Sequence, residues 1–139
     1  AMGVLQALWN PDVEDLFRLL LNDESADVRR LAADGLGLNA RPGDVRAHES
    51  LARATTDENP AVRRAAVLAV GRLNAPGAAD VLIAAWKRDD GKDPFLADAH
   101  TRAIERLGKA GVDALLKTAD DGDNAVKDKA ALTFAGFRE

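Results

Sequence analysis

The amino-acid sequence repeats with a period of 34 residues, and this period constrains the fold more than any other feature. Segment 23–37 reads DESADVRRLAADGLG and segment 57–71 reads DENPAVRRAAVLAVG, so Arg29 matches Arg63 and Gly37 matches Gly71. A further step of 34 residues places Ile104 at the position of Val70, and DNAVKDKAALTFAG forms a shorter fourth unit. Such a period is typical of stacked helical units, because no single unit can bury its apolar face alone.

Each unit begins with a helical pattern that precedes an Asp-rich turn. In these segments apolar residues recur at helical spacing, as Leu82 and Trp86 do. The second segment is the weakest, with only Val45, Ala47, Leu51 and Ala54 expected to face inward. The spacing predicts first helices over residues 12–22, 43–55, 77–88 and 111–120.

The turns carry residues that begin and separate helices. Asp and Asn side chains there can accept backbone N–H groups, and Pro60 and Pro94 suit the first turn of a second helix. Gly43, Gly77 and Gly111 open the way from one unit to the next and predict turns with positive φ.

Composition agrees with an all-α fold. The chain has 139 residues, of which 28 are Ala and 18 Leu against 10 Val and 2 Ile, and this balance favours helices over sheets. The absence of Cys excludes disulfides, thiolate metal sites and a cysteine nucleophile. The net charge of −4 argues against a general polyanion binder. No apolar run approaches the roughly 20 residues of a membrane span, so no membrane insertion by this segment is expected.

We therefore predict an α-solenoid of about four helix–turn–helix repeats with a right-handed superhelix, forming a single domain over 1–139. Both ends lack the polar cap that solenoids normally need, which predicts a piece of a larger protein whose ends self-associate. The expected boundaries are 1–10 for the end of a preceding repeat, then about 11–40, 41–75, 76–109 and 110–139.

The D-x-x-V-R-x-x-A pattern at the second helices resembles HEAT repeats, in the short form also found in bilin lyases. DPFLADAHTRAIERLGKAGVDALL at 93–116 and QALW at 6–9 are similar to the HEAT-repeat portion of planctomycete-type membrane-bound dehydrogenases with c-type haem. That resemblance implies a periplasmic or secreted location. The haem motif C-x-x-C-H is absent from this chain, so the resemblance assigns no redox role and no cofactor to its residues.

The paired arginines have a structural and a functional interpretation. Arg29 and Arg63 are expected to bond to turn carboxylates such as Asp23 and Asp57 and so to join neighbouring units. The residues one position on, with others on the same stripe, are expected to form an inner partner surface on the second helices. This candidate surface comprises Arg30, Asp34, Arg64, Leu68, Asp98, Arg102 and Asp128.

Catalytic candidates are few. His48-Glu49 is the one His-Glu pair but lies in a first helix, whereas HEAT-type di-iron hydroxylases carry theirs on second helices. We expect His48 to be exposed, and His100 to be buried and hydrogen-bonded. Ser25 is explained by helix capping, and the aspartate runs lack the spacing of a calcium loop. We predict no catalytic, cofactor or metal residues.

Trp9 and Trp86 are the two largest aromatic residues. We expect both to serve helix packing or an interface, not chemistry.

The function predicted for this domain is a non-catalytic scaffold that binds a protein or another domain of the same polypeptide. One alternative is nucleic-acid binding through the arginines, although an inner face that changes sign is a poor track for a phosphate backbone. A second alternative is an accessory domain of a larger secreted dehydrogenase or haem protein. A third is an enzyme, either metal-dependent or a chromophore lyase.

Overall fold

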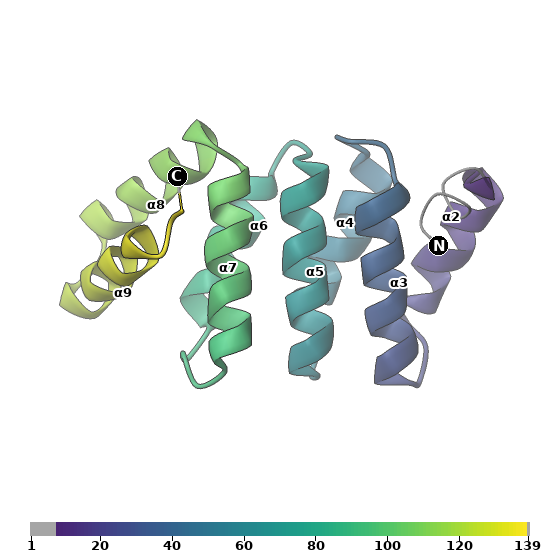
Figure 1. Ribbon diagram of the computed structural model, residues 1–139, viewed down its shortest axis with the longest axis horizontal. Coiled ribbons are helices and arrows are strands. Elements are labelled where there is room, and N and C mark those ends of the chain that lie inside the picture. Colours follow the sequence, from purple (N-terminus) through teal and green to yellow (C-terminus); the bar gives the residue numbers. More distant parts are fainter. Residues whose placement is uncertain (1–7, 139) are drawn as a thin grey trace.

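The computed structural model describes residues 8–138, and within that range it contains eight helices and no strand. Helices α3, α5 and α7 lie side by side in one layer, and α4 and α6 lie behind them in a second layer (Figure 1). The prediction of an all-α repeat solenoid is confirmed. The helices are α2 (Pro11–Leu20), α3 (Ala26–Asn39), α4 (Val45–Ala54), α5 (Pro60–Leu73), α6 (Ala78–Arg88), α7 (Pro94–Arg106), α8 (Lys109–Asp121) and α9 (Asn124–Ala135).

The second helix of each pair begins at a side-chain cap. The Ser25 hydroxyl accepts from the backbone N–H of Val28, and the Asn59 and Asp93 side chains do the same for α5 and α7. Pro60 and Pro94 each occupy the first position of their helix, where a missing N–H costs nothing. The predicted capping roles are therefore confirmed.

Two of the three predicted glycine turns have positive φ. Gly43 and Gly77 have φ values of 81° and 90°. The prediction is wrong for Gly111, because α8 begins two residues earlier and the positive φ falls on Gly108. Gly111 is needed for a different reason: a Cβ there would lie 2.1 Å from the carbonyl oxygen of Ile104.

Alanine and glycine allow the second helices to pack closely. Ala66 and Ala69 of α5 are fully buried, and Gly37 of α3 lies against Ala69 so closely that a Cβ on the glycine would be 2.7 Å from the Ala69 Cβ. Gly71 lies in the same way against Ala103 of α7. The high Ala content therefore serves helix approach at repeated positions.

The prediction for α4 is partly wrong. Ala47, Leu51 and Ala54 are buried as expected, whereas Val45 is exposed. His48, expected to be exposed, is buried. The buried face of α4 includes positions 48 and 50, which are polar, and excludes position 45. The burial of Val45 and His48 therefore departs from the prediction because it follows position on the helix and not residue type.

The last helical pair is tilted away from the row of α3, α5 and α7 (Figure 1). It is joined to the preceding repeat by the buried Trp86, whose indole N–H donates to the Thr133 hydroxyl at 2.9 Å. Lys129 donates to the backbone carbonyl oxygens of Trp86 and Asp89. The packing role predicted for Trp86 is confirmed.

At the other end, Trp9 packs edge to face against Phe17, with ring centroids 5.0 Å apart. The predicted end of a preceding repeat falls mostly on residues 1–7, which lie outside the described residues.

Candidate protein-binding surface

Arg29 joins the first two turns. Its Nε and Nη2 donate to the two carboxylate oxygens of Asp57 at 2.8 and 3.1 Å, and its Nη1 donates to the carbonyl oxygens of Asp23 and Glu24. The side chain is buried. A guanidinium suits this place because its fixed fork binds a carboxylate with two parallel hydrogen bonds. The predicted role of Arg29 in joining neighbouring units is thus realised through Asp57.

The electrostatics of this pair follow from its surroundings. Partial burial raises the pKa of Asp57, but hydrogen bonds from Arg29 and from the backbone N–H of Asn59 outweigh burial and hold the pKa below 3.8. The hydrogen bond to Asp57 in turn raises the pKa of Arg29. Both groups are therefore charged at neutral pH.

Replacing Arg29 by glutamine is expected to lower the melting temperature by about 10 °C, because it leaves a half-buried carboxylate and two turn carbonyls without donors. The matched control is Arg30→Gln on the next residue, whose ion pair with Asp34 is solvent-accessible, and it should lower the melting temperature by no more than about 2 °C. Thermal unfolding followed by circular dichroism compares the two variants. Equal losses would contradict the linking role of Arg29.

The second helices carry a groove of about 350 Å³. We call it the second-helix groove. It brings together side chains from α3, α5 and α7, one repeat after another. Its lining comprises Arg30, Asp34, Arg64, Ala65, Leu68, Phe95, Asp98, Ala99 and Arg102.

Six of the seven residues predicted for a partner surface therefore line one groove. The exception is Asp128, which lies exposed on α9 and outside the lining. Its separation follows from the tilt of α8 and α9, which takes α9 out of the row of second helices (Figure 1).

Two of the three arginines in the groove form ion pairs with aspartates of the same groove. Arg30 lies 3.6 Å from Asp34, and Arg102 lies 3.5 Å from Asp98. Arg64 has no ion pair among the described residues, and its guanidinium carbon lies 5.9 Å from the centre of the Phe95 ring. Arg64 is therefore the arginine of this groove whose charge is available to a partner.

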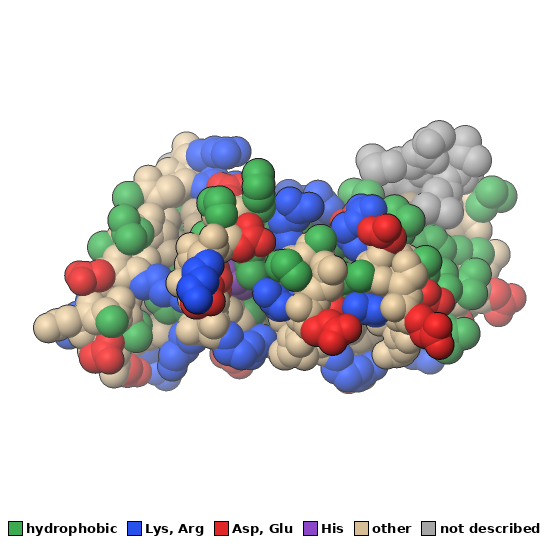
Figure 2. Space-filling view, turned by 90° about the horizontal axis from the view of Figure 1, so that it is seen from below, with side chains coloured by type: hydrophobic (Ala, Val, Ile, Leu, Met, Phe, Trp, Pro, Cys, Tyr) green, Lys and Arg blue, Asp and Glu red, His purple; other side chains and the backbone are tan. Residues whose placement is uncertain are grey.

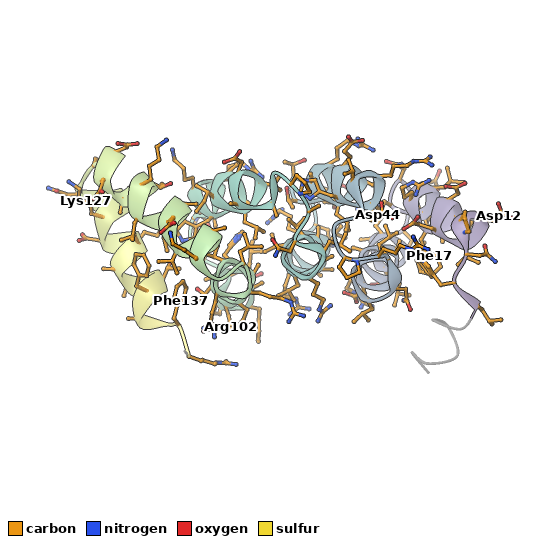
Figure 3. The ribbon with its side chains drawn as sticks, turned by 90° about the horizontal axis from the view of Figure 1, so that it is seen from above. Asp12, Phe17, Asp44, Arg102, Lys127 and Phe137 are labelled. Atoms are coloured by element: carbon orange, nitrogen blue, oxygen red, sulfur yellow. The ribbon has the colours of Figure 1, made fainter. Side chains whose placement is uncertain are left out.

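Arg102 also holds the end of the chain. Its guanidinium donates to Glu105 and to the carbonyl oxygen of Gly136, and Glu105 accepts from the backbone N–H of Arg138. Figure 3 shows Arg102 on α7 close to Phe137 after α9. The Phe137 ring packs edge to face on Phe134 at 5.4 Å. Arg102 thus has a structural role in addition to lining the groove.

A second hollow of about 480 Å³ continues from the groove, since both are lined by Leu68 and Arg102. It adds Arg72 and Arg106, which are 34 residues apart and share a position in successive repeats. Neither arginine belongs to the surface predicted from the sequence, although both follow the 34-residue period.

Phe95 was also missed as a surface residue. It is 69% exposed in the first turn of α7, at the position where the preceding repeat has Ala61. The replacement of a small residue by a large aromatic one was the signal for it.

His100 is buried as predicted but is not hydrogen-bonded. Only 2% of it is exposed, neither ring nitrogen has a hydrogen-bond partner, and its Nε2 lies 3.6 Å from an Asp89 carboxylate oxygen. Burial lowers the pKa of His100 to about 4, with Lys129 and Arg88 also lowering it and Asp89 raising it. His100 is therefore neutral at pH 7.

Among residues 8–138 no group of three or more His, Asp or Glu side chains is placed to hold a metal ion. None of the helices described in that range is both long and apolar enough to cross a membrane.

The comparisons with known proteins agree with this architecture. The family model described as HEAT repeats matches residues 13–97, which span most of α2 to the start of α7. The chain belongs to the HEAT-repeat family. It is also similar to the uncharacterized phycocyanin operon protein Z of Pseudanabaena tenuis, with 31% identity over an alignment of 152 positions that covers 99% of this chain and 74% of that protein. HEAT repeats generally mediate protein interactions, and the second-helix groove is where this chain presents side chains from successive repeats together.

Proposed function

We propose that the chain is a non-catalytic HEAT-repeat scaffold that binds a segment of another protein, or of another domain of the same polypeptide, in the second-helix groove. The observation that carries the proposal is the convergence of three successive second helices on one groove. Each of these helices contributes charged side chains to the groove, so a bound segment that lies along the solenoid contacts several repeats at once.

The residues in the groove are of the kinds that contribute most to protein interfaces. Arginine and aromatic residues are enriched where binding energy concentrates. Here Arg64 lies beside the exposed Phe95, and Leu68 is half-buried in the groove floor. Arg30 and Arg102 already have acidic neighbours in the groove. A partner with an apolar side chain flanked by an acidic one would contact Leu68, Phe95 and Arg64 at once.

Photo-crosslinking locates the surface and finds the partner. A photoreactive amino acid is placed at Leu68 or Phe95 in the groove, and at the exposed Leu116 of α8 as the control, in cells of the organism that carries the gene. Both groove positions are expected to crosslink to the same protein, identified by mass spectrometry, while Leu116 does not. Equal crosslinking from Leu116 would place the interface elsewhere.

Once the partner is purified, Arg64→Glu is expected to weaken binding at least about 10-fold, because it reverses the charge that no residue of the groove neutralises. The matched control is Arg46→Glu, an exposed arginine of α4 on the other layer, which should change the dissociation constant less than about 2-fold. Isothermal titration calorimetry measures both. Equal effects of the two variants would reject the groove as the binding surface.

The nucleic-acid alternative has weaker support. The arginines of the groove alternate with Asp34 and Asp98, whereas a phosphate backbone favours continuous positive charge. Binding of a labelled oligonucleotide at micromolar protein, weakening steeply with salt, would favour this alternative over a protein partner.

The scaffold has three further candidate partners: a second copy of this chain, a secreted dehydrogenase and phycocyanin subunits. The exposed Leu132 on α9 and Leu19 on α2 are consistent with end-to-end self-association. The resemblance to the HEAT-repeat portion of secreted dehydrogenases suggests a docking domain, which a C-x-x-C-H motif elsewhere in the same gene product would support. The Pseudanabaena relative suggests phycocyanin subunits as the first purified proteins to test for binding.

A further inference from the structure

Arg63 repeats half of the arrangement made by Arg29. Its Nη1 donates to the carbonyl oxygens of Asp57 and Glu58 at 2.8 and 3.1 Å, as Arg29 does to the preceding turn. In the Arg29 arrangement the Nε and Nη2 atoms hold the Asp57 carboxylate of the next turn. The residue 34 positions beyond Asp57 is Gly91, which has no carboxylate to offer. Within residues 8–138 the Nε and Nη2 of Arg63 have no hydrogen-bond or ion-pair partner.

A pocket of about 350 Å³ lies where that carboxylate is missing. We call it the Arg63 pocket, and Arg88, Asp89, Leu96 and His100 also line it. It lies between the turn before α5 and the turn before α7. Figure 2 views the molecule from the side of these turns and shows basic and acidic side chains interspersed there, with histidine visible between them.

His100 is a second, independent indication of a ligand. It is almost fully buried, it lines the Arg63 pocket, and neither of its ring nitrogens has a hydrogen-bond partner. Buried polar atoms are nearly always paired in folded proteins, so an unpaired one that borders a pocket indicates a group that the pocket accepts.

We propose that the Arg63 pocket binds a carboxylate group, which the Nε and Nη2 of Arg63 hold as Arg29 holds Asp57. Four carboxylates line the pocket beside Arg63 and Arg88. The Asp57 carboxylate is held by Arg29, the Asp89 side chain is buried beside His100, and the side chains of Asp90 and Glu58 are largely exposed. This acidic lining repels a ligand with two negative charges more strongly than a ligand with one. A carboxylate has the planar, singly charged geometry that the guanidinium fork matches, whereas a phosphate dianion would be repelled more strongly.

This site is separate from the proposed protein-binding surface. Arg63 and Arg64 are adjacent in sequence, but Arg63 lines the pocket at the turns and Arg64 lines the second-helix groove. The two proposals therefore fail independently.

The test is titration of the whole chain with three probes, followed by NMR of the arginine Nε–H signals and the histidine ring protons. The probes are acetate, the blocked tripeptide acetyl-Ala-Asp-Ala-amide and inorganic phosphate, at constant pH and ionic strength. Saturable shifts of the Arg63 and His100 signals are expected with the carboxylate probes, with dissociation constants on the order of millimolar for a single charged pair. Acetate and tripeptide binding equally would indicate a free organic acid as ligand, and tighter tripeptide binding would indicate a protein side chain.

Variants at Arg63 decide whether the fork is responsible. Arg63→Lys keeps the charge and removes the fork, and Arg63→Gln removes both. Each is expected to weaken carboxylate binding at least about 10-fold. Arg46→Gln, at an exposed arginine of α4 that lines neither site, is expected to leave it unchanged. Circular dichroism checks that each variant is folded. Absence of saturation, unchanged binding in Arg63→Lys, or tighter binding of phosphate than of acetate would overturn the proposal.

Discussion

Replacing Gly37 by valine is expected to lower the free energy of unfolding by about 3 kcal/mol, among the largest losses that a single substitution in this chain can cause. A Cβ at Gly37 would lie 2.7 Å from the Cβ and 2.9 Å from the Cα of Ala69. Because the Cα belongs to the backbone of α5, the clash cannot be relieved by a rotamer change. Helices α3 and α5 must separate instead, and the contact between the first two repeats is weakened.

The control is Ala84→Val on the exposed side of α6, which adds a β-branched residue without a clash and should cost less than about 1 kcal/mol. A swap supplies a sharper test. Gly37→Ala and Ala69→Gly each destabilise alone, and their combination moves the methyl group across the interface. The double variant is expected to be more stable than the sum of the single losses allows. Additive losses in chemical denaturation would show that the two helices do not meet as closely as described.

The repeat period alone was sufficient for the fold. A match of Gly37 to Gly71 and of Arg29 to Arg63 predicts the same packing twice, and the structure shows close helix contacts at both glycines. Local chemistry likewise placed the caps at Ser25 and the prolines of the second helices correctly.

Residue type does not predict burial on α4, and the analogy between repeats does not predict where α8 begins. His48 is polar, yet it lies on the face of α4 that packs against the core, and this position determines its burial. Gly111 was expected to form a turn by analogy with Gly77, but α8 begins earlier than the other first helices, and the same residue is used for close packing.

The candidate surface was predictable in composition but not in extent. Equivalent positions on successive second helices predict that Arg30, Arg64 and Leu68 share one surface, and these residues line one groove. The equivalent positions alone do not predict that α9 tilts away from the row of second helices and takes Asp128 out of the groove (Figure 1), because the period sets which residues are equivalent and not the angle between repeats. The equivalent positions also do not predict the hydrogen bond from Arg102 to the carbonyl oxygen of Gly136.

Lowering the pH from 7 to 4 is expected to destabilise the protein through His100. Burial holds the pKa of His100 at about 4, below the value of 6.5 for an unburied histidine. Between these values the unfolded chain binds a proton that the folded chain does not, so the free energy of unfolding falls as the pH falls through this window. The shift corresponds to a loss of up to about 3 kcal/mol, complete near pH 4. Loss of the Arg29–Asp57 pair belongs to a lower window, because the pKa of Asp57 is held below 3.8.

His100→Gln keeps a polar side chain of similar size and removes this titration. Urea denaturation at pH 7, 5.5 and 4.5 is expected to show a smaller fall in unfolding free energy for this variant than for the natural sequence. His48→Gln is the matched control: it also replaces a buried histidine but retains His100, and so it should keep the full contribution of His100 to that fall. If His100→Gln loses stability with acid as steeply as the natural sequence does, the buried imidazole is not responsible. The acid sensitivity would then have to come from the carboxylates that join the turns.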